Sequence, residues 1–173
     1  MVTIKQAEQF HKNRKQIDRV VLTQAKKNKS VVYGGHALNH HLPPHLDRHT
    51  EDYDILTTHP QQSAKSLEKK LDRKYGGDLF YVKPAQHPGT FKVMNRVTNK
   101  EVADYTKKEK NVTHVKSKRG VRYVGLSHIT KGLMKTLKDK ESSYRHPKDR
   151  DALLRIKILE SKKKSVTKRR GKK

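Results

Sequence analysis

The sequence predicts one domain of the α/β (α+β) class, followed by a disordered basic tail. Its length of 173 residues fits a single domain with a tail. Short runs of β-branched and aromatic residues alternate with longer segments in which apolar residues recur at helical spacing. Only 31% of the residues are hydrophobic and the mean hydropathy is -1.06. These apolar residues are clustered, so we expect a small core rather than general disorder.

The first predicted element is a helix over residues 3–28, which we treat as an N-terminal helix within residues 1–29. Thr3 and Gln6 fit a capping box at its start. Apolar residues then return on one face at helical spacing: Ile4, Ala7, Phe10, Ile17, Val21 and Ala25.

A strand, a turn and a short helix are expected next. Residues 31–33 form a short buried strand that ends at Gly34 and Gly35, and residues 37–42 form a helix that ends at Pro43.

The centre of the chain predicts a strand, a helix and three more strands. Residues 53–56 form the first strand, and Pro60 starts a helix that Gly76 and Gly77 end. The three further strands cover residues 79–82, 91–97 and 102–105. The tight turn at Asn99 favours antiparallel pairing of the last two.

The C-terminal part predicts a short strand, two helices and the tail. Residues 122–124 form the strand, Ser127 caps the next helix, and Pro147 opens the last one. From Ser161 onward the sequence reads SKKKSVTKRRGKK, which has no acidic residue and only one large apolar residue, so we expect residues 161–173 to be disordered.

The charge of the chain predicts a polyanionic partner. Lys and Arg number 42 against 17 Asp and Glu, giving a net charge of +25 and a pI of about 10.3. Such an excess favours nucleic acid. A membrane surface is disfavoured, because the sequence has no long apolar run and no amphipathic helix rich in Trp or Phe.

Localisation is predicted from cysteine content and from both ends of the sequence. The absence of cysteine excludes disulfides and thiolate metal sites and fits an intracellular protein. The first residues lack the apolar segment of a signal peptide. We therefore expect a cytoplasmic protein, or a nuclear one if the basic tail acts as an import signal.

Three carboxylates stand out in this basic sequence. Asp52 and Asp54 are two residues apart in a predicted strand, so they project to the same face. Two such charges repel by roughly 4 kcal/mol at an effective dielectric of about 20. They therefore need a cation or a raised pKa, and oxygen ligands suit Mg²⁺. A D-x-D pair also occurs by chance at solvated strand ends, but a third carboxylate, Asp104, lies in a later strand and fits a two-metal site.

Phosphate-binding groups are predicted around these carboxylates. Glycines at a strand-to-helix turn, here Gly34 and Gly35, let backbone N–H groups approach a phosphate. Arg48 and Lys135 are candidate counter-charges.

Two blocks carry a resemblance to a known family. They read Gly34-Gly35-His36-Ala37-Leu38 and then Arg48-His49-Thr50-Glu51-Asp52-Tyr53-Asp54. This order resembles the nucleotidyltransferases of the DNA polymerase β-like superfamily, and most of all their minimal, abortive-infection toxin-like branch. It is also similar to the catalytic module of poxvirus-type poly(A) polymerases.

The downstream sequence fits the same family over about residues 30 to 160. A Ser-capped helix with a Lys and a Lys-Asp-x-x-Asp-Leu-like helix follow, here with Lys135 and residues 148–154. His36 departs from the pattern, because a small residue or Thr is commoner there.

The resemblance implies a nucleotidyltransferase fold over residues 30–160, with a mixed β-sheet flanked by helices. It implies that Asp52, Asp54 and Asp104 bind two Mg²⁺ ions, for which Mn²⁺ can substitute, and form the catalytic set. It also implies an NTP substrate and transfer of a nucleoside monophosphate to an acceptor hydroxyl, which the charge of the chain suggests is the 3′ end of RNA or single-stranded DNA. The alternative is a non-catalytic, basic nucleic-acid-binding protein on the same fold.

The histidines of the connecting loop allow another interpretation. Five of them lie within 14 residues: His36, His40, His41, His45 and His49. A zinc site is disfavoured, because Pro43 and Pro44 interrupt the helix and no cysteine is present. We expect a polar loop that contacts phosphate when its histidines are protonated.

Overall fold

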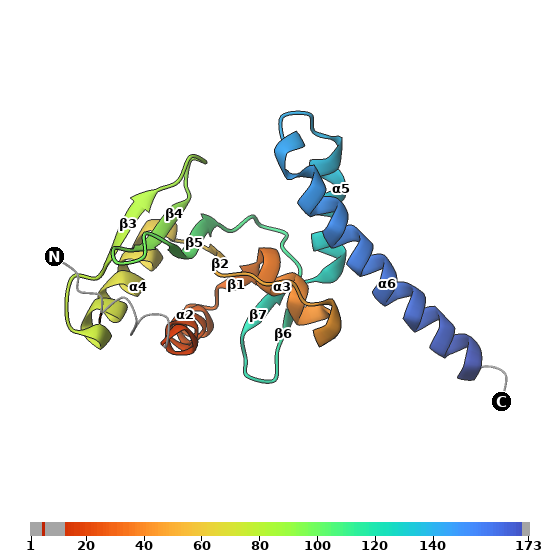
Figure 1. Cartoon of the computed structure of the whole chain (residues 1–173), viewed down its shortest axis with the longest axis horizontal. Helices are drawn as coiled ribbons and strands as arrows, with labels where there is room; N and C mark the ends of the chain where they lie inside the picture. Colours follow the sequence, from red (N-terminus) through yellow and green to blue (C-terminus); the bar gives the residue numbers. More distant parts are fainter. Residues whose placement is uncertain (1–4, 6–12, 171–173) are drawn as a thin grey trace.

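The computed structural model describes residue 5 and residues 13–170 of the chain (Figure 1). Its strands are β1 (Val31–Tyr33), β2 (Tyr53–Thr57), β3 (Phe80–Pro84), β4 (Phe91–Asn95), β5 (Glu101–Lys107), β6 (His114–Lys116) and β7 (Arg122–Val124). They form one mixed sheet of seven strands in the order β3-β4-β5-β2-β1-β7-β6.

Helices lie on both sides of this sheet. They are α2 (Arg14–Lys27), α3 (Gly34–His41), α4 (Pro60–Tyr75), α5 (Leu126–Lys138) and α6 (His146–Arg170), with two short 3-10 helices, η1 (Pro44–Leu46) and η2 (Ser143–Arg145). The expected mixed sheet flanked by helices is therefore confirmed. No helix among the described residues is both long enough and apolar enough to cross a membrane.

Two neighbouring strands at the centre of the sheet position the candidate site. β2 runs parallel to β5, and Asp54 pairs with Asp104. β1 lies antiparallel on the other side of β2, where Tyr33 pairs with Asp54. β4 pairs with β5 in antiparallel fashion, as the tight turn between them predicted.

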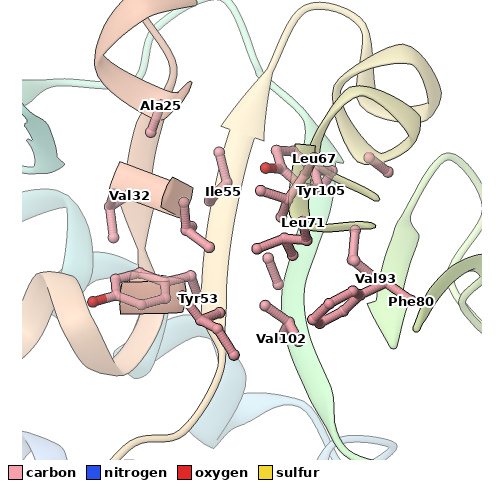
Figure 2. Packing of buried hydrophobic residues seen from close by; sticks show 14 of the residues in the cluster. Ala25, Val32, Tyr53, Ile55, Leu67, Leu71, Phe80, Val93, Val102 and Tyr105 are labelled. Carbon is pink, nitrogen blue, oxygen red and sulfur yellow. The ribbon is translucent and has the colours of Figure 1, made fainter. Parts of the chain in front are cut away.

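The main core lies between one face of this sheet and the helices α2 and α4. Ile55 and Tyr105 project from β2 and β5 into this core, beside Leu67 and Leu71 of α4 (Figure 2). All four are fully buried, with exposed fractions of 0 or 1%. Ile17 and Val21 of α2 belong to the same cluster, so the N-terminal helix is part of this core.

The opposite face is covered only in part. Ala37 of α3 and Ile129 of α5 pack around Val31 of β1, and Leu38 packs against Ile156 of α6. The two C-terminal helices contact each other and lie apart from β3 and β4 (Figure 1).

Most predicted elements agree with the structure, and three details differ. The helix predicted over residues 3–28 is interrupted at Asn13, which is the N-cap of α2, and the predicted Thr3 and Gln6 capping box lies outside the described residues. The N-cap of α5 is Gly125 instead of Ser127, because the helix already begins at Leu126, which packs against the apolar cluster between α3 and α6. Strand β6 was not predicted, since its three residues are all exposed and show no apolar alternation.

The tail also differs from expectation between residues 161 and 170. These residues continue α6 as a helix up to Arg170, whereas the sequence predicted disorder from Ser161. The physical reason is that Lys and Arg are good helix formers, and a helix already nucleated by packing is extended at little cost.

Candidate active site

Asp54 and Asp104 lie side by side at the centre of the sheet. They are 50 residues apart in sequence, yet they are direct partners across the parallel β2–β5 pair. Their neighbours Ile55 and Tyr105 point into the core, so alternation along the strands turns both carboxylates to the opposite face. Asp52 comes just before β2, and its negative charge raises the pKa of Asp54.

Burial and mutual repulsion disfavour the charged forms of these carboxylates. The pKa of Asp54 is raised to about 7, first by burial and then by the charges of Asp52, Asp104 and Glu101. The pKa of Asp104 is raised to about 6, again first by burial and then by Glu101, while Lys92 opposes this shift. The protein therefore concentrates more negative charge here than its own cations compensate.

This donor set fits a divalent cation. Oδ1 of Asp104 is buried and has no hydrogen-bond partner within the described part of the chain. Carboxylate oxygens are the ligands that Mg²⁺ prefers. Asp54 and Asp104, with Asp52 just before β2, are the residues that would hold Mg²⁺, although the three do not each bring a ligand oxygen within 4.8 Å of the other two.

The Gly34–Gly35 turn lies directly against the carboxylates. Gly34 has a φ of +65°, and a Cβ atom added to it would lie 1.9 Å from Oδ2 of Asp54. A Cβ at Gly35 would lie 2.9 Å from Oγ1 of Thr50. Because Gly34 has no side chain, the backbone at the start of α3 approaches the carboxylate of Asp54 closely.

The two predicted basic residues lie in different places. Arg48 is half-buried in the loop before β2, and Asn39 of α3 holds its backbone through hydrogen bonds of 2.6 and 3.0 Å. Lys135 lies exposed on α5, where its charge acts on Asp139.

Two other basic residues act on this site through their charges, Arg145 at the end of η2 and Lys148 near the start of α6. The charge of Lys148 lowers the pKa of Asp54. Arg145 similarly acts on Tyr33, whose pKa is raised by burial and by Asp54. The sequence did contain a signal for Lys148, because it opens the 148–154 block that resembles the family.

Sequence reasoning also missed Lys92 and Glu101. Nζ of Lys92 donates a hydrogen bond to Oε2 of Glu101 and lies 3.6 Å from Oδ2 of Asp104. With so many lysines in the chain, nothing in the sequence distinguished this one.

The histidines of the connecting loop serve packing more than was expected. His36 stacks on Tyr53 with 3.7 Å between ring centroids, and His40 stacks on Tyr123 at 4.0 Å. Nε2 of His41 lies 2.7 Å from the carbonyl oxygen of Val124. Burial lowers the pKa of His36 to about 4, so this ring is neutral at pH 7. The expected polar loop is therefore partly a set of packed aromatic contacts.

A separate acidic cluster lies at the other side of the sheet. Carboxylate oxygens of Glu68, Asp72 and Asp78 come within 4.8 Å of one another, close enough to share an ion. Oδ1 of Asp72 already accepts hydrogen bonds from the backbone N–H groups of Leu79 and Phe80. The cluster is therefore distinct from the carboxylates of β2 and β5.

Comparison with known proteins finds similarity in structure. No protein-family model matches the sequence, and no curated protein matches it. The fold is similar to the crystal structure of the Megavirus polyadenylate synthase, with a TM-score of 0.70 and 19% identity. The match covers 83% of this chain and 31% of that one, so the chain spans about a third of the synthase.

A second solved structure is less similar. JHP933 from Helicobacter pylori matches at 13% identity and a TM-score of 0.42, over 70% of this chain and 55% of that one. Similarity at this level supports no argument, so the abortive-infection branch stays a prediction. The chain has the fold of part of a viral polyadenylate synthase, which confirms at the level of the fold the predicted similarity to nucleotidyltransferases of the poly(A) polymerase type.

Proposed function

We propose that the protein is a metal-dependent nucleotidyltransferase that moves a nucleoside monophosphate from an NTP to the 3′ hydroxyl of a nucleic acid, most of all RNA. The observation that carries this proposal is the pairing of Asp54 with Asp104 on adjacent strands. Both have raised pKa values, which a cation would lower again.

The carboxylates have defined roles in this proposal. Asp52, Asp54 and Asp104 hold the cations, and Asp104 also helps to remove the proton of the acceptor hydroxyl. When bound there, Mg²⁺, or Mn²⁺ in its place, would lower the pKa of that hydroxyl and neutralise charge on the triphosphate. The acceptor oxygen then forms a bond to the α-phosphorus, and the bond from this phosphorus to pyrophosphate breaks.

The remaining groups of the site position the triphosphate. The turn of Gly34 and Gly35 lies at the start of α3, with Gly34 against Asp54, where backbone N–H groups could contact phosphates that share its cation. Lys148 supplies the counter-charge that the sequence assigned to Lys135, because it is Lys148 whose charge acts on Asp54. Arg48, fixed by Asn39, stays a further candidate.

The charge of the chain supports a nucleic-acid acceptor. A net charge of +25 favours a polyanion over a small neutral acceptor. The same charge also favours the alternative function, a nucleic-acid-binding protein without catalysis. That alternative predicts binding that weakens steeply with salt and does not respond to Mg²⁺ or NTP.

Primer extension separates the two functions. The protein is incubated with Mg²⁺, one labelled NTP at a time, and a single-stranded RNA or DNA primer, and the products are separated on a denaturing gel. Asp54→Asn and Asp104→Asn keep the side-chain size and remove the charge. Asp47→Asn is the matched control, since Asp47 is exposed in the loop that leads to β2.

We expect extension by the wild type and by Asp47→Asn, and none by the two other variants. Equal extension by Asp54→Asn would refute the assigned site. Tight primer binding by every variant, with extension by none, would favour the binding protein.

A further inference from the structure

A lysine and a glutamate form a bridge beside Asp104. Lys92 of β4 is the direct partner of Asp104 across the antiparallel β4–β5 pair. Its Nζ contacts one oxygen of Glu101 and lies 3.6 Å from Oδ2 of Asp104. The three side chains are 29, 19 and 16% exposed for Lys92, Glu101 and Asp104 respectively, so water screens their charges only in part.

An irregularity in the sheet creates this bridge. Residues three apart in a regular strand point to opposite faces, so Glu101 should point away from Asp104. The β4–β5 register, however, shifts between Val93 and Met94. Val93 pairs with Ala103 and Met94 with Glu101, which leaves Val102 as an extra residue on β5.

The side chains around this bulge confirm its effect. Val102 and its neighbour Ala103 are both buried in the core between the sheet and α4, although neighbours in a regular strand would face opposite ways. Glu101 is thereby turned toward Lys92 and Asp104. Bulges commonly re-aim a side chain next to a functional site.

The bridge leaves one oxygen of each carboxylate without a partner. Oδ1 of Asp104 and Oε1 of Glu101 are both buried, and neither has a hydrogen-bond partner among the residues that the structure describes. Lys92 thus pairs with Oδ2 of Asp104, and Oδ1 stays outside that pair. Groups that hold a metal-binding carboxylate in this way typically change metal affinity or activity by about 10- to 100-fold when they are mutated.

We propose that Lys92, held in place by Glu101, is a positioning residue for Asp104: it holds Oδ2 of Asp104 and thereby presents Oδ1 to the divalent cation. The proposal rests on the proposed function for its effect on turnover, but its effect on cation binding does not require catalysis. Lys92 also offsets one negative charge, so it limits how tightly the carboxylates bind a cation when no NTP is present.

Substitutions of the two bridge residues should change cation affinity in opposite directions. Lys92→Met removes a positive charge and leaves Glu101 and Asp104 uncompensated, which strengthens cation binding. Glu101→Gln removes a negative charge, so the full positive charge of Lys92 acts on Asp104. Cation binding should therefore become weaker. These opposite shifts test the charge of the bridge, and the fall in turnover of Lys92→Met tests the positioning of Asp104.

The test measures Mn²⁺ binding and turnover separately. Mn²⁺ is titrated without NTP and followed by electron paramagnetic resonance, with every protein carrying Glu68→Gln so that the acidic cluster of Glu68, Asp72 and Asp78 does not contribute. Lys83→Met is the matched control, because Lys83 is exposed and is the β3 partner of Lys92. Lys92→Arg keeps the charge, and circular dichroism confirms that each variant is folded.

We expect Lys92→Met to bind Mn²⁺ about tenfold more tightly and Glu101→Gln about tenfold more weakly, with Lys83→Met unchanged. In primer extension, kcat should fall about 10- to 100-fold for Lys92→Met at unchanged KM for NTP, and less for Lys92→Arg. Mn²⁺ affinities that shift in the same direction in Lys92→Met and Glu101→Gln would overturn the proposal, as would a kcat of Lys92→Met within twofold of the wild type. If the wild type extends no primer, the proposed function fails, while the Mn²⁺ titration still decides the role of Lys92.

Discussion

The two faces of β2 and β5 differ sharply although they belong to the same two strands. On one face, Ile55 and Tyr105 are fully buried among apolar side chains of α2 and α4 (Figure 2). On the other, Asp54 and Asp104 lie side by side with raised pKa values. Adjacent residues thus have opposite effects on stability: the apolar face stabilises the fold, and the carboxylate face destabilises it until a cation binds.

The comparison shows how a small basic protein tolerates such a site. Strand alternation places the carboxylates directly on the back of the best-packed part of the core. The core holds the backbone of both strands, so the carboxylates stay close despite their repulsion. Four predictions test this division, from the largest expected effect to the smallest.

Truncation on the apolar face should have the largest effect on stability. Ile55→Ala removes a fully buried side chain from the core and should lower the free energy of unfolding by about 4 kcal/mol. Urea unfolding followed by circular dichroism measures this loss. The folded variant should still bind a cation. If Ile55→Ala no longer binds a cation at temperatures where it is folded, the carboxylate face depends on the packing of the apolar face.

Deprotonation of the carboxylate face should lower stability by a somewhat smaller amount. The pKa of Asp54 is about 7 in the folded protein and near 3.9 in an unfolded chain. The folded state therefore holds this proton more tightly than the unfolded chain does. In metal-free protein, the contribution of Asp54 to the free energy of unfolding should be fully present below about pH 4. It should fall by on the order of 3 kcal/mol as the pH rises to about 7.

Asp54→Asn is the control for this pH dependence. The variant should lose most of the slope and be more stable than the wild type at pH 8 without metal, and added Mg²⁺ should stabilise only the wild type. Thermal melts in EDTA and in Mg²⁺ at several pH values measure this. A wild type that is equally stable at pH 5 and pH 8 in EDTA would contradict the assigned burial of Asp54.

A methyl group at the glycine turn should disturb the carboxylate face alone. Gly34→Ala places a Cβ where Oδ2 of Asp54 now lies and requires a left-handed backbone. We expect a loss of about 1–2 kcal/mol from backbone strain and a marked fall in primer extension. In Gly132→Ala the new Cβ meets open space on α5, so stability should rise slightly and activity should not change. Equal activity of Gly34→Ala and wild type would show that Asp54 can move without loss of function.

The acidic residue at the edge of the site should have the smallest effect. Glu51 is exposed, and it forms a surface ion pair with Lys100 at 3.0 Å. Exposed ion pairs contribute little to stability. Glu51→Gln should therefore match the wild type in thermal melts and in primer extension, and a large fall in activity would place Glu51 in the site with Asp52.

Much of this arrangement could be predicted from the sequence, because its signals are local. β1, β2 and α4 lie within one or two residues of their predicted bounds, since apolar periodicity, Pro60 and Gly76 act on neighbouring residues. The spacing of Asp52 and Asp54 likewise predicted a shared face. Local signals failed where they were absent, as in the exposed strand β6.

The roles of single basic residues could not be predicted from the sequence. Lys135 lies among apolar helical residues and Lys148 among charged ones, yet it is the charge of Lys148 that acts on Asp54. The same holds for Lys92, which lies next to Asp104 only because β4 pairs with β5 in one register. The charge of a single lysine acts on a carboxylate over only a few ångströms. Its effect therefore depends on distances between residues that are far apart in the sequence.

By itself, the sequence determined the alternating pattern of helices and strands, the glycine turn and the paired aspartates, because these depend on residues close together in the chain. The tertiary structure alone decided that Asp54 meets Asp104, and that a bulge at Val102 turns Glu101 toward Lys92. Strand order and register depend on how distant segments bury their apolar faces together. A shift of one residue in that register would reverse which side chains face the core and which face the site.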